Sequence, residues 1–174
     1  GEVEYLFVGV YVDDLACAYS SDAPGSLYAE FTESLSSRWE VDDEGPISDL
    51  LAVEFVQNDD DTITLHQRAY IERLVLEFGS GAREPRRQGV RTPNNGDLVQ
   101  AVADALAAKA AAEPPSSDTA SLEATRLYPR LVGAMLYCST NTRPDIAYAV
   151  GMLCRCLSCP TAALFECALR VLHY

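Results

Sequence analysis

Two acids interrupt an apolar run near the start of the chain, where residues 4–20 are Glu4-Tyr-Leu-Phe-Val-Gly-Val-Tyr-Val-Asp-Asp-Leu-Ala-Cys-Ala-Tyr-Ser20. The β-branched and aromatic residues of 4–12 favour a largely buried strand, and residues 15–20 favour a second one. This order of strand, two acids and strand predicts a tight antiparallel hairpin with Asp13 and Asp14 at or beside its tip.

The pattern on the C-terminal side of this hairpin alternates between helix and strand signals. Leu27, Phe31 and Leu35 repeat every four residues, which predicts a helix from about Pro24 to Arg38. A short strand is expected at 39–41. A strand over 51–56, a turn at 58–61 and a return strand at 62–66 are expected to form a second hairpin. A helix over 68–78 should follow and end at Gly79.

The second half of the chain is predicted to be helical after a basic loop. Residues 80–97 lack periodicity and contain four arginines, Arg83, Arg86, Arg87 and Arg91. An Ala-rich helix over 98–112, which we expect to be only marginally packed, leads to a Pro/Ser linker. Helical patterns follow at 119–127, 129–139 and 144–157 and again from 161. At the start of the 144–157 helix, Thr142 is the predicted N-cap, Pro144 lies in the first turn, and the charge of Asp145 complements the helix dipole.

Composition limits the classes of protein that the chain can belong to. The 174 residues are 48% hydrophobic, enough for a folded core, but contain no apolar run of the roughly 20 residues that a membrane span needs. No signal-peptide pattern is present, so we expect a protein that is neither secreted nor membrane-bound. The net charge of −13 opposes general phosphate binding. If the protein binds nucleic acid, its basic surface must therefore be local or must come from another part of a longer protein.

The cysteines and histidines are expected to be structural. Cys154, Cys156 and Cys159 lack the spacing of a standard zinc pair. On a helix reaching 157, the first two would point about 200° apart, and we expect that Cys154, Cys156 and Cys159 bind no metal and form no disulfide. His66 and His173 are interpreted as structural residues.

Tyr11-Val12-Asp13-Asp14 is the one motif with a chemical meaning. Paired carboxylates on a rigid hairpin suit nucleotidyl transfer, in which two divalent ions about 3.5–4 Å apart act on the primer hydroxyl and on the triphosphate. Mg²⁺ prefers such oxygen ligands. The alternative is a solvated turn, because acids are common turn residues.

Several stretches, in order, resemble the copia-type retrotransposon reverse transcriptase, from its catalytic hairpin to its junction with ribonuclease H. The likeness covers almost the whole chain. Its parts are residues 5–15, residues 35–41, Ile63–Gln67 with Tyr70-Ile71 and Phe78-Gly79, Arg91-Thr-Pro93, residues 128–137, the run Thr142-Arg-Pro-Asp-Ile-Ala-Tyr-Ala-Val150, the run 153–160 and residues 168–174.

This resemblance implies an α+β fold, in which a partial polymerase palm is followed by a mostly helical thumb or connection segment. Residues 1–79 would form the C-terminal part of the palm, residues 80–118 a basic loop, Ala-rich helix and linker, and residues 119–174 a helical connection toward a ribonuclease H domain. The implied activity is RNA-directed DNA polymerisation in an intact Pol polyprotein, within a cytoplasmic retrotransposon particle and with the nucleus as a second compartment.

The resemblance also implies roles for individual residues. Asp13 and Asp14 would be two of three catalytic carboxylates and would hold Mg²⁺ or Mn²⁺. Tyr11 would line the primer terminus and Val12 would pack close to the template–primer, while the four loop arginines are candidates for phosphate contacts. The partners would be an RNA or DNA template–primer, dNTPs and the rest of the Pol polyprotein.

Two departures from the family keep other interpretations open. Leu51-Ala52 stands where the family usually has Leu-Gly, in a hairpin resembling a primer grip, and residues 98–118 are longer and richer in Ala. The third carboxylate belongs to an earlier palm strand that this chain does not contain. We therefore expect the isolated chain to be inactive, and the alternatives are a degraded retroelement relic or a non-catalytic interaction module.

Overall fold

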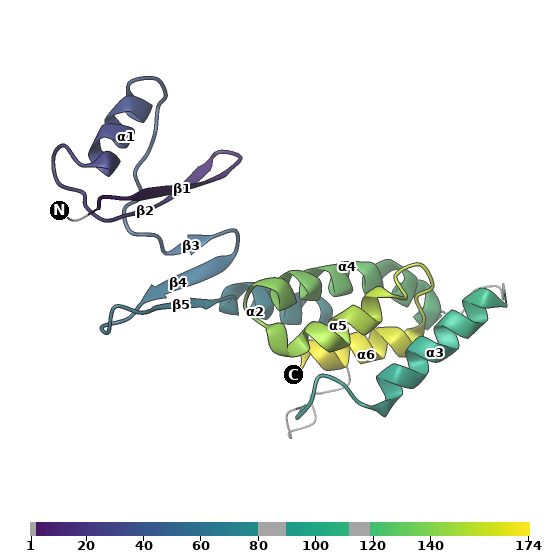
Figure 1. Ribbon diagram of the computed structural model, residues 1–174. Helices are drawn as coiled ribbons and strands as arrows, with labels where there is room; N and C mark the ends of the chain where they lie inside the picture. Colours follow the sequence, from purple (N-terminus) through teal and green to yellow (C-terminus); the bar gives the residue numbers. More distant parts are fainter. Residues whose placement is uncertain (1–2, 80–89, 112–118) are drawn as a thin grey trace. The chain divides into compact units, whose positions relative to one another are not determined.

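The computed structural model describes residues 3–79, 90–111 and 119–174. The chain divides into two compact units, Gly1–Ser48 (unit 1) and Asp49–Tyr174 (unit 2) (Figure 1). Together they are α+β, with small antiparallel sheets and a larger helical part. The boundary falls inside the 1–79 segment that the sequence assigns to the palm, and that assignment stays a prediction. Within the described residues, no helix has the length and apolar character needed to cross a lipid bilayer.

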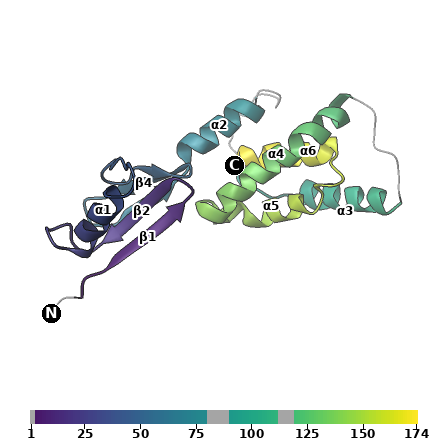
Figure 2. The same cartoon turned by 90° about the horizontal axis from the view of Figure 1, so that it is seen from above.

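Unit 1 begins with the predicted hairpin, which the structure confirms. Strands β1 (Leu6–Tyr11) and β2 (Asp14–Tyr19) pair antiparallel along their full length, and Figure 2 shows them side by side. The strands are shorter than predicted at their outer ends. Asp14 opens β2, where it pairs with Tyr11, and does not lie in the turn.

A short helix, α1 (Leu27–Ser36), follows the hairpin and is shorter than the predicted 24–38. The Ser26 side chain caps it by accepting a hydrogen bond from the Ala29 amide at 3.2 Å. The Glu4 carboxylate accepts from the Leu27 amide at 3.1 Å, and the rings of Tyr19 and Tyr28 stack with centroids 3.9 Å apart. These contacts attach α1 to the outer end of the hairpin.

Unit 1 has almost no buried side chains. Among its described residues, Ser26 alone is buried, and α1 buries none. The strand predicted at 39–41 is absent: this stretch is irregular, and Trp39 is 60% exposed. A strand needs a partner for its backbone groups, and the acidic residues that follow offer none. The β1–β2 pair is therefore a sheet without a hydrophobic layer of its own.

Unit 2 begins with a three-stranded antiparallel sheet in the order β3 (Asp49–Leu50), β4 (Val53–Gln57) and β5 (Ile63–His66). The predicted turn at 58–61 and return strand are confirmed. The predicted strand over 51–56 was wrong at its start, because Leu51 and Ala52 form a tight turn with φ of 53° and 59°. The pattern of alternating apolar residues there gave no sign of this reversal.

Helix α2 (Arg68–Phe78) has the predicted bounds and ends at Gly79. Helix α3 (Gly96–Ala110) is not marginally packed as expected, because it buries Leu98, Ala101, Val102 and Ala105. Small alanines allow its close approach to α5 and α6.

The last part of unit 2 differs from the sequence expectation in its helix boundaries. The patterns 119–127 and 129–139 form one helix, α4 (Thr119–Asn141), which continues through Pro129. Proline lacks a backbone N–H and disfavours a helix interior, but Tyr128, Leu131 and Val132 on both sides of it are fully buried and hold the helix together. A 3₁₀ turn η2 (Pro144–Ile146), α5 (Ala147–Cys154) and α6 (Ala162–Leu172) complete the chain.

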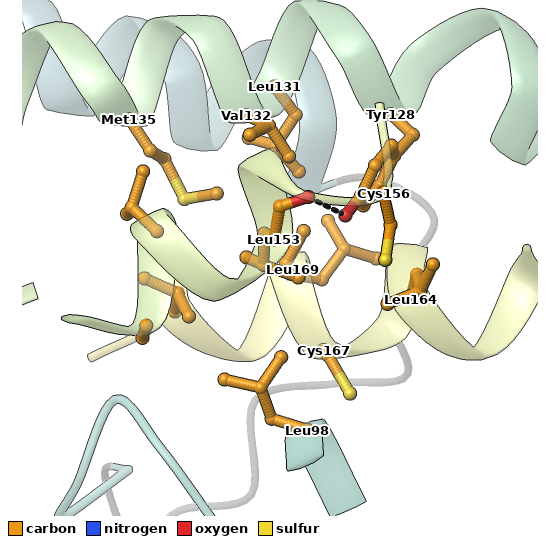
Figure 3. Packing of buried hydrophobic residues seen from close by; sticks show 14 of the residues in the cluster. Leu98, Tyr128, Leu131, Val132, Met135, Leu153, Cys156, Leu164, Cys167 and Leu169 are labelled. Carbon is orange, nitrogen blue, oxygen red and sulfur yellow. Dashed lines mark hydrogen bonds between the residues drawn. The ribbon is translucent and has the colours of Figure 1, made fainter. Parts of the chain in front are cut away.

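The hydrophobic core of the described residues lies among helices α2 to α6 (Figure 3). Its central tyrosine, Tyr128, donates a hydrogen bond from its hydroxyl to the Leu153 carbonyl at 2.8 Å, which satisfies a buried polar group. Unit 2 thus has the core that unit 1 lacks. The residues labelled in Figure 3 are Leu98, Tyr128, Leu131, Val132, Met135, Leu153, Cys156, Leu164, Cys167 and Leu169.

Candidate functional site

The tip of the β1–β2 hairpin is a two-residue turn of Val12 and Asp13, closed by the pairing of Tyr11 with Asp14. Val12 has a φ of 51°. A β-branched residue rarely adopts this left-handed conformation, because its Cβ crowds the backbone. The six-residue ladder behind the turn imposes the conformation and gives both acids a defined place at the end of the sheet.

The two carboxylates at this tip are open to solvent. Asp13 and Asp14 are both exposed, and within the described part of the chain neither takes part in an ion pair. Their oxygen lone pairs are therefore available to an outside ligand. Carboxylate oxygens are the ligands that Mg²⁺ and Mn²⁺ prefer, so the pair fits a divalent ion in its chemistry.

The hairpin has two different faces. Residues that pair across an antiparallel ladder share a face, and faces alternate along each strand. Tyr19 stacks on Tyr28, so its face is the one next to α1. The opposite face, here called the open face, comprises Phe7, Gly9, Tyr11, Asp14, Ala16 and Ala18.

The open face is aromatic at its ends and small in its middle. Phe7 is 68% exposed and Tyr11 is 53% exposed, while Gly9 and Ala16 pair between them. Exposed aromatic rings beside small residues form a flat surface on which a sugar or a base can lie. The sequence pointed to Tyr11 but missed Phe7, because an unbroken apolar run does not show which residues face a partner.

The phosphate contacts predicted for the four loop arginines stay a prediction. Arg83, Arg86 and Arg87 lie outside the described residues. Arg91 is exposed in the bend before α3 and belongs to unit 2, whereas Asp13 and Asp14 belong to unit 1. Tyr11, Val12, Asp13 and Asp14 are the predicted site residues that the structure brings together.

The hairpin that resembles a primer grip keeps its turn despite Ala52. Ala52 adopts φ of 59°, which glycine would adopt with less strain. The Leu51 carbonyl in this turn accepts a hydrogen bond from the Tyr137 hydroxyl of α4. Sequence patterns gave no signal for this contact, because its partners are 86 residues apart.

Glu54 and His66 act together at the start of α2. The Glu54 carboxylate accepts hydrogen bonds from the Ala69 amide at 3.0 Å and contacts His66 Nδ1 at 3.1 Å. The Ala69 hydrogen bond and the neighbouring His66 lower the pKa of Glu54. His66 thus has a structural contact, as its interpretation as a structural residue expected.

The Thr142–Asp145 run is organised differently from its prediction. Thr142 does not cap the following turn: its hydroxyl donates to Gln67 Oε1 at 2.8 Å, and Arg143 occupies the cap position. Arg143 binds Asp145 through two nitrogens, at 2.9 and 2.8 Å, and lies over the Tyr174 ring. Hydrogen bonds from Arg143 lower the pKa of Asp145, so this arginine is already engaged within the chain.

The chain is similar over nearly its whole length to proteins of transposons. It is 29% identical over 171 residues to a putative transposon Ty5-1 protein of Saccharomyces cerevisiae, covering 97% of this chain and 48% of that protein. It is 29% identical over 174 residues to the retrovirus-related Pol polyprotein from transposon TNT 1-94 of Nicotiana tabacum, covering 99% of this chain and 12% of the polyprotein. An uncharacterized mitochondrial protein of Arabidopsis thaliana is 30% identical over 169 residues, with 97% and 60% covered.

These likenesses support a retroelement-derived protein that corresponds to one part of a Pol polyprotein. The chain spans less than two thirds of the length of each of these relatives. No family model matches it, and no solved structure matches it.

Proposed function

We propose that the chain is the C-terminal palm and connection segment of a copia-type RNA-directed DNA polymerase. The observation that carries this proposal is the hairpin tip, where two adjacent exposed carboxylates end a strained turn beside an open aromatic face. The likeness to a Pol polyprotein supports it. In the β4–β5 turn, by contrast, the Asp60 carboxylate accepts hydrogen bonds from Thr62 within the turn.

The proposed roles follow from the positions of the side chains. Asp13 and Asp14 would hold Mg²⁺ or Mn²⁺ through their carboxylate oxygens. When bound, these ions favour ionisation of the primer 3′-hydroxyl and neutralise charge on the triphosphate. Tyr11 shares the open face with Asp14 and would line the primer terminus, while Val12, 80% exposed at the tip, would pack against the template–primer.

The described residues by themselves supply too few ligands for this reaction. Within the described residues, no group of three His, Cys, Asp or Glu side chains could hold a metal ion. A net charge of −13 also repels template and dNTP. We infer that a third carboxylate and the basic residues that clamp the triphosphate come from the rest of a Pol polyprotein, and that the 174-residue chain alone does not extend a primer.

The weak packing of unit 1 fits this reading. A two-stranded hairpin is marginally stable in water, and this one exposes Phe7, Val10, Tyr11 and Val12. In a polymerase palm, neighbouring strands and the template–primer would cover these side chains. The same exposure also favours the second candidate, a relic or non-catalytic module in which the hairpin has lost its surroundings.

A chimera tests the proposal. Residues 1–174 would replace the matching 174-residue stretch of the tobacco Pol polyprotein, and Mg²⁺-dependent primer extension on an RNA template would be measured. We expect extension by the chimera and its loss on Asp13→Asn with Asp14→Asn. The matched control is Asp59→Asn with Asp61→Asn, which removes the same charge from another hairpin and should leave activity unchanged.

Two outcomes decide against the proposal. A chimera that folds and binds template–primer but does not extend it supports the relic or module. Extension that survives the Asp13→Asn, Asp14→Asn double substitution shows that the chemistry lies elsewhere. A third outcome concerns only the inference that the isolated chain is inactive: extension by the 174-residue chain that disappears in the same double variant would overturn that inference.

A further inference from the structure

The chain leaves α5 in a tight turn and does not continue as the predicted helix to residue 157. Successive backbone hydrogen bonds join residues three apart: Cys156 N to Leu153 O at 3.0 Å, Leu157 N to Cys154 O at 3.4 Å, and Cys159 N to Cys156 O at 3.0 Å. In this 3₁₀-like geometry, side chains at i and i+3 lie over one another. Cys156 and Cys159 therefore share one side of the turn.

The expectation that the three cysteines form no disulfide was argued from a helix continuing to residue 157, whereas α5 ends at Cys154. That argument compared Cys154 with Cys156, which would point in different directions on a helix. The pair that the turn brings together is Cys156 with Cys159, because residues three apart in this geometry lie on one side of the turn. A hydrogen-bonded four-residue turn keeps its end Cα atoms within about 7 Å, and disulfides need about 4.4–6.8 Å.

The two thiols differ in their access to solvent. Cys156 is fully buried and belongs to the core cluster in Figure 3. Cys159 is half-buried. An outside reagent can therefore reach Cys159 first, and Cys156 is placed behind it.

Cationic groups lie beside this turn. The Lys109 ammonium of α3 donates to the Ser158 hydroxyl at 2.6 Å, between the two cysteines. Burial raises the pKa of the Cys156 thiol to about 11, while Arg155 and Lys109 act in the opposite direction. The cations favour a transient thiolate at a buried position that otherwise disfavours one.

We propose that Cys156 and Cys159 form a reversible dithiol–disulfide site that is closed by thiol–disulfide exchange with a small disulfide such as glutathione disulfide. The Cys159 thiolate attacks one sulfur of the reagent, forming a mixed disulfide and releasing one glutathione thiolate. Cys156 then attacks the Cys159 sulfur, and the second glutathione thiolate leaves. The protein loses two protons and two electrons, the reagent is reduced to two thiols, and the intramolecular disulfide forms.

The closed disulfide would fix the turn that joins α5 to α6 and that α3 contacts through Lys109. The other four cysteines do not share this geometry. Cys154 is the last residue of α5, and Cys138 and Cys167 are buried on α4 and α6. Cys17 belongs to unit 1.

The test is thiol mapping of the folded 174-residue chain in glutathione buffers of increasing oxidised fraction. Free thiols are trapped by an alkylating reagent, and peptides are analysed by mass spectrometry. We expect Cys156 and Cys159 to lose alkylation together, in a peptide that is lighter by two hydrogens and has no glutathione adduct. The effect must be reversed by a reducing buffer.

Three variants separate the two cysteine roles. Cys156→Ala should keep glutathione as a stable adduct on Cys159, Cys159→Ser should show neither adduct nor disulfide, and Cys154→Ser should behave like the unaltered chain. Circular dichroism confirms that each variant is folded. The inference is overturned if the unaltered chain stops at the Cys159 adduct, if both thiols stay reduced, or if the pairing involves Cys154.

Discussion

The β1–β2 and β4–β5 hairpins both place acids between two short antiparallel strands, but they use these acids differently. In β4–β5 the Asp60 carboxylate accepts hydrogen bonds from the Thr62 amide at 3.2 Å and from its hydroxyl at 2.6 Å. Asn58 Nδ2 donates to the Thr62 and Thr64 hydroxyls, both at 2.9 Å. These contacts close the turn, so its central acid has a structural task.

In β1–β2 the turn is closed by the backbone alone. The residue with positive φ is Val12, whereas β4–β5 uses Asp61 at φ of 63°. Asp tolerates that conformation far better than a β-branched residue does. One turn thus has a favourable residue at positive φ and one engaged acid, Asp60, whereas the other has an unfavourable residue and two exposed acids. The role of Asp60 is explained by its turn, whereas among the described residues no such contact engages Asp13 or Asp14.

Amide hydrogen exchange should show the largest difference between the two hairpins. We expect β1–β2 amides to exchange with almost no protection, because their unit has no buried hydrophobic layer. The β4–β5 amides should be protected more strongly, since Val53 is buried and Glu54 binds the start of α2. Protection should be greatest in α4, and equal protection of both hairpins would contradict this account of unit 1.

Metal binding should separate the two acid pairs. We expect Mn²⁺ to bind weakly near Asp13 and Asp14, broadening the NMR signals of Tyr11 and Leu15. Asp13→Asn with Asp14→Asn should weaken this binding at least about tenfold, equivalent to about 1.4 kcal/mol. Asp59→Asn with Asp61→Asn removes the same charge and should leave the broadening in place. Equal effects of the two double variants would reduce the site to general electrostatic attraction.

Much of the fold could be predicted from the sequence where local patterns and local causes coincide. The alternation around Asp13 and Asp14 gave the β1–β2 hairpin, and the apolar stripe with Gly79 gave both ends of α2. The motif also located the candidate site, because a tight hairpin tip depends on neighbouring residues. In each case the deciding interactions lie within a few residues of one another.

The features that the sequence did not predict depend on distant partners. Thr142 looks like a cap but bonds Gln67, which is 75 residues away. Pro129 looks like a helix boundary, but the burial of Tyr128 on α4 outweighs its missing hydrogen bond. The open face of the hairpin was missed because both faces of β1 are apolar. Tertiary contacts decide such positions, and a local pattern does not show them.

Relief of backbone strain should stabilise the turns by smaller amounts. Ala52→Gly should raise the free energy of unfolding of unit 2 by about 0.5–1 kcal/mol, because the left-handed conformation costs Ala about 1–2 kcal/mol and the added chain entropy offsets part of it. Asp61→Gly is the matched control in β4–β5 and should gain less. Urea denaturation measures both, and a loss of stability in Ala52→Gly would contradict the turn geometry.

The smallest expected effect is the acid sensitivity of the β4–β5 hairpin. Hydrogen bonds from Thr62 lower the pKa of Asp60, and the Ala69 amide and His66 lower the pKa of Glu54. A carboxyl whose pKa is lower in the folded state stabilises the fold above its unfolded pKa of about 4 and loses this effect as the pH falls through the folded value. We therefore expect the urea midpoint of unit 2 to decline below about pH 4.

Asp60→Asn and Glu54→Gln should each flatten this decline, because a neutral amide does not titrate. Asp59→Asn, beside Asp60 in the same turn, is the control for the loss of one charge. A decline of the same steepness in Asp60→Asn, Glu54→Gln and Asp59→Asn would assign it to the overall charge of the chain, and the contrast between engaged and exposed acids would then lose its support in β4–β5.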